Sequence, residues 1–80
     1  MKIPRDINAK DLIKYLSKMG YEQSRQTGSH IRLSVKVNSN LFHITIPNHN
    51  PIKVGTLNNI LKEISNQLSI SKDDLMQKLF

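Results

Sequence analysis

Cysteine and tryptophan are absent from this chain of 80 residues, and its aromatic side chains are limited to two tyrosines and two phenylalanines. Without cysteine, the chain forms neither a disulfide framework nor a thiolate zinc site. So few aromatic rings leave little surface for stacking bases, which argues against a single-strand binder that works by stacking. Phe42 and Phe80 are assigned to the hydrophobic core. Recognition of a nucleic acid by its shape and through its phosphates is therefore favoured over recognition by base stacking.

Long hydrophobic runs are also missing. No apolar run approaches the ~20 residues of a membrane-spanning helix, and the first residues lack the apolar stretch of a signal peptide. We therefore expect a cytoplasmic protein that does not engage a membrane. Its 80 residues are expected to form one domain, residues 1–80, which buries only roughly 60% of its unfolded surface.

Acidic residues are scarce, and residues 12–62 contain a single one, Glu22. This excludes the paired carboxylates of a glycosidase and the clustered carboxylates of a hard-metal site. The chain has no glycine-rich phosphate loop, and its three histidines, His30, His43 and His49, match no zinc-binding spacing. Neither a metal ion nor another cofactor is therefore expected.

The positive charge is distributed unevenly. Residues 54–80 contain three lysines and three acids, which cancel, so the whole net charge of +6 falls in residues 1–53. A basic region of this size suggests a polyanionic or acidic partner. A basic surface that serves solubility alone is the alternative.

Hydrophobic periodicity predicts three helices and three strands. The first helix begins after Asn8 as N-cap and ends near Gly20, the second begins near Gly55 or Thr56, and the third begins at Ser71. The strands are expected at residues 21–26, 29–37 and 41–46. This order, α-β-β-β-α-α, predicts an α+β fold with a three-stranded antiparallel sheet. The first two helices pack on its apolar face and leave the other face open.

The clearest strand begins at the stretch Gly28–Leu33. From His30 to Val37, polar and apolar residues alternate, and the polar side consists of His30, Arg32, Ser34 and Lys36. Because successive side chains of a strand point to opposite faces, these four are expected on the open face of the sheet. A titratable ring beside fixed positive charge is what binding and cleavage of a phosphodiester require.

A ribonuclease can work without a metal ion, because RNA supplies its own nucleophile, the 2′-hydroxyl. Histidine transfers the protons, since its reference pKa of about 6.5 lies near working pH, and Arg or Lys stabilises the phosphorane. His30, with Arg32 and Lys36, fits these roles, and His49 is a candidate second group. The alternative for His30 is a surface histidine with no role, and for His43 and His49 it is local hydrogen bonding.

At Gly28–Leu33 the sequence resembles the HicA toxins, the small mRNA-cleaving partners of HicB antitoxins. Residues 12–21 are similar to the first helix of that family and its exit, Ile46–His49 to the end of its third strand, and Gly55–Leu57 with the following Ile60–Leu61 to the start of its second helix. One departure is that residues 62–68 continue as a helical pattern, where members of the family commonly have a glycine.

The resemblance implies a double-stranded-RNA-binding-domain-like fold and the toxin of a type II toxin–antitoxin system. That toxin is a metal-independent endoribonuclease (an mRNA interferase), is neutralised by a HicB-type antitoxin, and has His30 at the position of the essential histidine of the family. The candidate RNA-binding residues are Ser29, Arg32, Lys36, Arg25 and His49. A non-catalytic RNA-binding module is the main alternative, and a plain protein-interaction domain is another.

Overall fold

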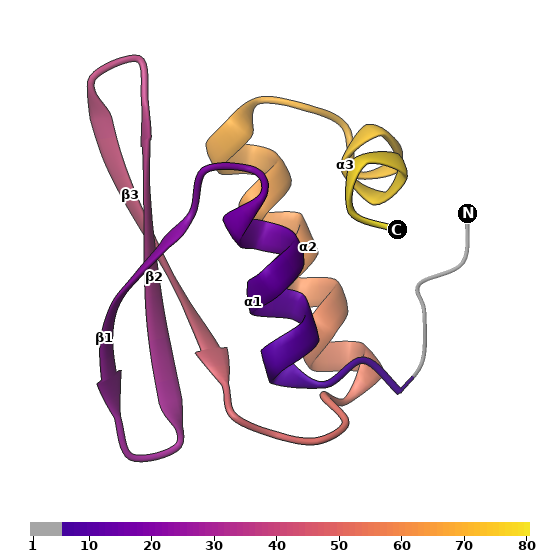
Figure 1. The fold of residues 1–80 in the computed structure, drawn as a ribbon. Helices are drawn as coiled ribbons and strands as arrows, with labels where there is room; N and C mark the ends of the chain where they lie inside the picture. Colours follow the sequence, from indigo (N-terminus) through magenta and orange to yellow (C-terminus); the bar gives the residue numbers. More distant parts are fainter. Residues whose placement is uncertain (1–5) are drawn as a thin grey trace.

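In a computed structural model, which describes residues 6–80, the chain forms three helices and three strands in the order α-β-β-β-α-α (Figure 1). The elements are α1 (Ala9–Ser17), β1 (Glu22–Thr27), β2 (His30–Val37), β3 (Asn40–Pro47), α2 (Val54–Leu68) and α3 (Lys72–Leu79). The predicted α+β class and element order are confirmed. The arrangement is compatible with a double-stranded-RNA-binding-domain-like fold, which stays a prediction, as does the single domain of residues 1–80.

The sheet is an antiparallel meander in which β2 is the central strand. Each hairpin closes through a two-residue turn, and positive φ angles of 57° at Gly28, 50° at Asn38 and 70° at Ser39 permit the tight reversals. β1 contains an irregularity between Gln23 and Arg25 that leaves Ser24 without a partner in the register. The strands therefore begin and end within one or two residues of the predicted positions.

The two faces of the sheet differ sharply in burial. The apolar residues of β2 and β3 that face the helices are buried, namely Ile31, Leu33, Val35, Ile44 and Ile46. α1 and α2 both pack on this face, and α3 packs against α2 farther from the sheet (Figure 1). No helix within residues 6–80 covers the opposite face, as the alternation of β2 predicted.

α1 follows an amphipathic pattern and buries Ala9, Leu12 and Leu16. Asn8 occupies the N-cap position as predicted, but its side chain makes no capping hydrogen bond. Instead, the Ala9 N–H donates to the backbone carbonyl of His49 at 3.3 Å. The loop after β3 therefore satisfies one of the free amides at the start of the helix.

α2 continues through residues 62–68, in agreement with the helical pattern there. It ends where Ser69 adopts a left-handed conformation with φ of 56°, and the Ile70 N–H donates to the Ser65 carbonyl at 3.0 Å. This is the arrangement that glycine usually provides at a helix end. The helix thus ends at a serine, whose Cβ atom makes this left-handed conformation less favourable than it would be for glycine.

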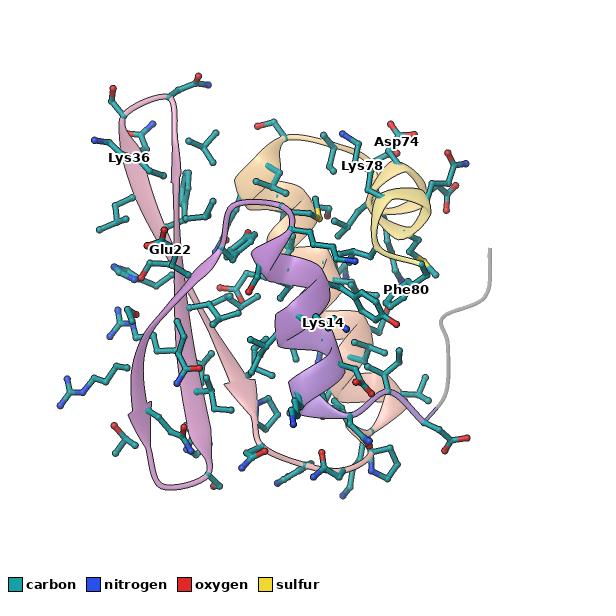
Figure 2. The ribbon with its side chains drawn as sticks, viewed as in Figure 1. Lys14, Glu22, Lys36, Asp74, Lys78 and Phe80 are labelled. Atoms are coloured by element: carbon teal, nitrogen blue, oxygen red, sulfur yellow. The ribbon has the colours of Figure 1, made fainter. Side chains whose placement is uncertain are left out.

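α3 begins directly after Ser71, the predicted start, and the Ser71 side chain caps it by accepting a hydrogen bond from the Asp74 N–H at 3.1 Å. Its buried residues are Leu75, Met76 and Leu79. The assignment of Phe80 to the core is wrong, because this ring follows the last helical turn and is 41% exposed. Figure 2 shows it beyond the helix, where it meets Tyr15 edge to face at 5.6 Å.

No helix within residues 6–80 is long and apolar enough to cross a membrane.

Candidate functional site

The open face of β2 presents the predicted row of polar side chains. His30, Arg32 and Lys36 are exposed, and Ser34 is half-buried between them. Their positions follow from the pleat of the strand, because the alternate residues are held against α1 and α2 by burial. The row is therefore fixed by the core on the other side of the sheet.

Arg25 and Arg32 lie directly opposite each other on β1 and β2. Directly paired residues have Cβ atoms about 4.5–5.5 Å apart, and like charges in this relation are destabilising. The other cross-strand neighbour of Arg32 is Thr45, which does not compensate the charge. Two guanidinium groups so placed can bind one anion between them, and an anion there would relieve their repulsion.

His30 is the first residue of β2 and pairs with Thr27 and Pro47. The turn before it is tied to the loop after β3, because the Asn48 N–H donates to the Ser29 carbonyl at 2.7 Å. His49, the next residue, is exposed, and its carbonyl accepts from the N-terminus of α1. The backbones that bear the imidazoles of His30 and His49 are therefore held together at one end of the sheet.

Lys36 lies on the same face but not beside His30. Six residues of strand separate them, which corresponds to roughly 20 Å at ~3.4 Å per residue. Figure 2 shows Lys36 near the β2–β3 turn, and its cross-strand neighbour is Leu41. Lys36 and His30 are therefore too far apart to touch one phosphate group.

A second histidine, His43 on β3, also lies on the open face. It pairs with Ser34, and its Nδ1 atom is 2.9 Å from the Ser34 hydroxyl, which donates to the hydroxyl of Ser24 at 3.0 Å. Local hydrogen bonding was the alternative role considered for His43, and the structure shows such a bond. The alternation of β3 indicated the face of His43, but its partner depends on the register between two strands.

The outer edge of β3 is held at the same residue. The Gln67 side chain donates from Nε2 to the His43 carbonyl at 2.8 Å and accepts from the Tyr21 hydroxyl at 2.8 Å. Burial, with a smaller contribution from the charge of Glu63, raises the pKa of Tyr21 to about 12. Tyr21 therefore keeps its proton and stays a hydrogen-bond donor throughout the neutral range.

No cluster of three His, Cys, Asp or Glu side chains that could hold a metal ion occurs in the part of the chain that the structure describes. The site is instead a cationic surface on which His30 and His43 lie at different positions along the strands. Of the predicted residues, the structure brings Ser29, His30, Arg25 and Arg32 to one end of the open face. Lys36 lies at the other end.

Comparison with protein families matches residues 9–65 to the family described as the HicA toxin of bacterial toxin–antitoxin systems. The matched region covers α1, the three strands and most of α2, and so includes all the candidate site residues. No curated protein and no solved structure matches the chain.

Proposed function

Since the chain belongs to the HicA toxin family, and so to the toxins of toxin–antitoxin systems, we propose that it is an endoribonuclease that cleaves mRNA. We further propose that a HicB-type antitoxin neutralises it by covering the open face of the sheet. One observation supports this activity above the others: His30 is exposed next to a pair of guanidinium groups that directly oppose each other across two strands.

Cleavage would use the 2′-hydroxyl of the RNA as nucleophile. Its oxygen bonds to the adjacent phosphorus as its proton is removed, and the bond from phosphorus to the 5′-oxygen breaks as that oxygen gains a proton. The products are a 2′,3′-cyclic phosphate and a free 5′-hydroxyl, and no metal ion is required. In this proposal His30 is the general acid or base, because an imidazole both accepts and donates protons near neutral pH.

The cations would bind the charged group on which the reaction occurs. Arg32 lies two residues beyond His30 on the same strand face, about 7 Å away along the strand. Together with Arg25 it can hold the phosphate and stabilise the added negative charge of the phosphorane. Ser29 and His49 flank His30 as further RNA contacts, whereas Lys36 would bind the RNA backbone several residues away along the sheet.

The decisive variant is His30→Ala. We expect loss of RNA cleavage by at least about 100-fold and loss of growth arrest in cells, with an unchanged circular dichroism spectrum because His30 is exposed. Gln77→Ala, at an exposed position of α3, serves as the matched control. A His30→Ala protein that cleaves RNA as fast as the parent would contradict the assignment.

A second experiment distinguishes a ribonuclease from a non-catalytic RNA-binding module. Pure protein treated with EDTA is incubated with labelled RNA, and the products are tested for a 2′,3′-cyclic phosphate end. We expect cleavage to persist without metal. Binding without any product, with or without added metal ions, would instead support the binding module.

A further inference from the structure

The ring of His43 is held at a fixed position on the open face. The Nδ1 atom is 2.9 Å from the Ser34 hydroxyl, and the backbone carbonyl of His43 accepts from Gln67 at 2.8 Å. His43 is nevertheless exposed, so its other ring nitrogen, Nε2, is available to solvent. Such an anchored yet accessible imidazole is suited to contact a bound ligand.

The hydroxyl groups beside His43 determine which ring nitrogen bears the proton. The Ser24 hydroxyl donates to the Arg32 carbonyl at 3.3 Å, which uses its only hydrogen. The Ser34 hydroxyl donates to Ser24 at 3.0 Å, which uses its hydrogen as well. If the two serines donate in this direction, the Ser34 oxygen can only accept from His43; Nδ1 then bears the hydrogen and the neutral ring presents the Nε2 lone pair outward.

His43 cannot act at the same linkage as His30. The partner of His43 on β2 is Ser34, four residues beyond His30, which corresponds to roughly 13 Å along the strand. The pair formed by Arg32 and Thr45 lies between them. Beside Ser34 the surface is hollowed by a cavity of about 240 Å³, which Glu22 also lines. A chain bound along β2 would therefore meet His43 with a different nucleotide from the one at His30.

We propose that His43 is a second RNA contact, which accepts a hydrogen bond through Nε2 from a nucleotide beyond the one that is cleaved. This inference rests on the proposed function. A phosphodiester offers only acceptors, so the group bound by the neutral ring is a donor, either a ribose 2′-hydroxyl or an N–H group of a base. Ser34 is the positioning residue, because it sets the orientation and the protonated nitrogen of the ring.

The tautomer can be measured without RNA. Nitrogen-15 NMR of the free protein at about pH 8, where an imidazole is neutral, should show hydrogen on Nδ1 and none on Nε2 of His43. Ser34→Ala should shift the population toward the other tautomer while the sheet stays folded. Hydrogen on Nε2 in the parent protein would mean that the hydroxyl chain runs in the reverse direction, and it would overturn the proposal.

The RNA contact is tested with two substitutions of His43 in the His30→Ala background, which keeps the RNA intact. An asparagine amide replaces Nδ1 and can still donate to Ser34, whereas a glutamine amide extends toward the position of Nε2 and can accept there. We expect His43→Asn to weaken binding of a single-stranded RNA about fivefold to tenfold and His43→Gln to retain more of the affinity. Gln77→Asn, on α3, is the control.

Two further probes, polyuridine and an all-deoxy chain (single-stranded DNA), identify the group that donates to Nε2 of His43. If the effect of His43→Asn persists on polyuridine but disappears on the all-deoxy chain, the donor is the 2′-hydroxyl. If it persists on DNA, which has no 2′-hydroxyl, the donor is an N–H group of a base. Equal affinities of parent and His43→Asn for all three probes would overturn the proposal, and so would an effect on antitoxin binding alone. Neither result would affect the role of His30, which the cleavage assay tests separately.

Discussion

At the scale of single residues, the exposed pair of arginines has an effect that can be measured. Arg25 and Arg32 oppose each other without a carboxylate at a directly paired position. The repulsion between them costs on the order of 0.2–1 kcal/mol in the free protein. A phosphate bound between them would reverse the sign of this interaction. We therefore expect the pair to lower the stability of the fold and to raise its affinity for a polyanion.

We expect Arg25→Gln to weaken RNA binding and to reduce the salt dependence of the affinity. For a single strand, losing one phosphate contact lowers the slope of log K against log salt by about 0.7. Lys62→Gln removes the same charge from an exposed position on α2 and should leave the slope nearly unchanged. Equal slopes for the two variants would show that charge alone, and not its position, determines binding.

Tyr21 gives the fold a dependence on alkaline pH. Its pKa is raised to about 12 by burial, against a reference value of about 10. The folded state therefore holds this proton more tightly than the unfolded chain. Its contribution to stability is complete below about pH 10 and is lost as the pH rises from about 10 to about 12.

We expect Tyr21→Phe to lower the free energy of unfolding at neutral pH by about 1–2 kcal/mol, because Gln67 loses its hydroxyl donor. Urea unfolding at several pH values should show this difference shrinking above about pH 10. Tyr15→Phe, which alters the ring beside Phe80, is the control and should keep the alkaline loss of stability. A constant difference between parent and Tyr21→Phe would contradict the explanation.

At the scale of elements, the end of α2 is a site of backbone strain. Ser69 has φ of 56°, in the left-handed region that a side chain disfavours. We expect Ser69→Gly to raise the free energy of unfolding by about 0.5–1 kcal/mol, which is a rise in Tm of roughly 2–8 °C for a chain of this size. Thermal unfolding measures it, and Lys62→Gly, inside the same helix, should instead destabilise. An unchanged or lower Tm for Ser69→Gly would contradict the prediction.

The elements themselves were predictable because their signals are local. The alternation of β2 and the periodic apolar residues of α2 indicate both the type of structure and the buried face. The N-cap of α3 follows in the same way from Ser71. At α1 the N-cap position of Asn8 was predictable, but the capping bond was not, because the carbonyl that accepts from the Ala9 N–H belongs to His49, forty residues away in the sequence.

The candidate site was predictable to the extent that it lies on one strand. His30 and Arg32 share a face by alternation alone, and the structure places them there. The opposition of Arg25 to Arg32 and the bond from His43 to Ser34 depend on register, and in β1 an unpaired Ser24 shifts that register. A single sequence without pairing information does not specify such contacts.

At the scale of the whole molecule, the helices lie on one side of the sheet (Figure 1). The exposed side chains of β2 that are proposed to bind RNA lie on the other side. The surplus of positive charge falls in residues 1–53, which include all three strands. A polyanion approaching the molecule would therefore be attracted to the strand region more than to the C-terminal helices. The core thus uses one face of β2 and β3, and the proposed RNA contacts use the other face of the sheet.

The separation between the packed face and the open face of the sheet has a practical consequence for work with a toxic protein. Because His30 contributes to the uncovered side of β2 and nothing to the packed interior, a harmless version that differs at that single position should retain the shape seen by an inhibitor. Such a variant could be produced in quantity without the antitoxin, and it could then be used to isolate the antitoxin by affinity capture.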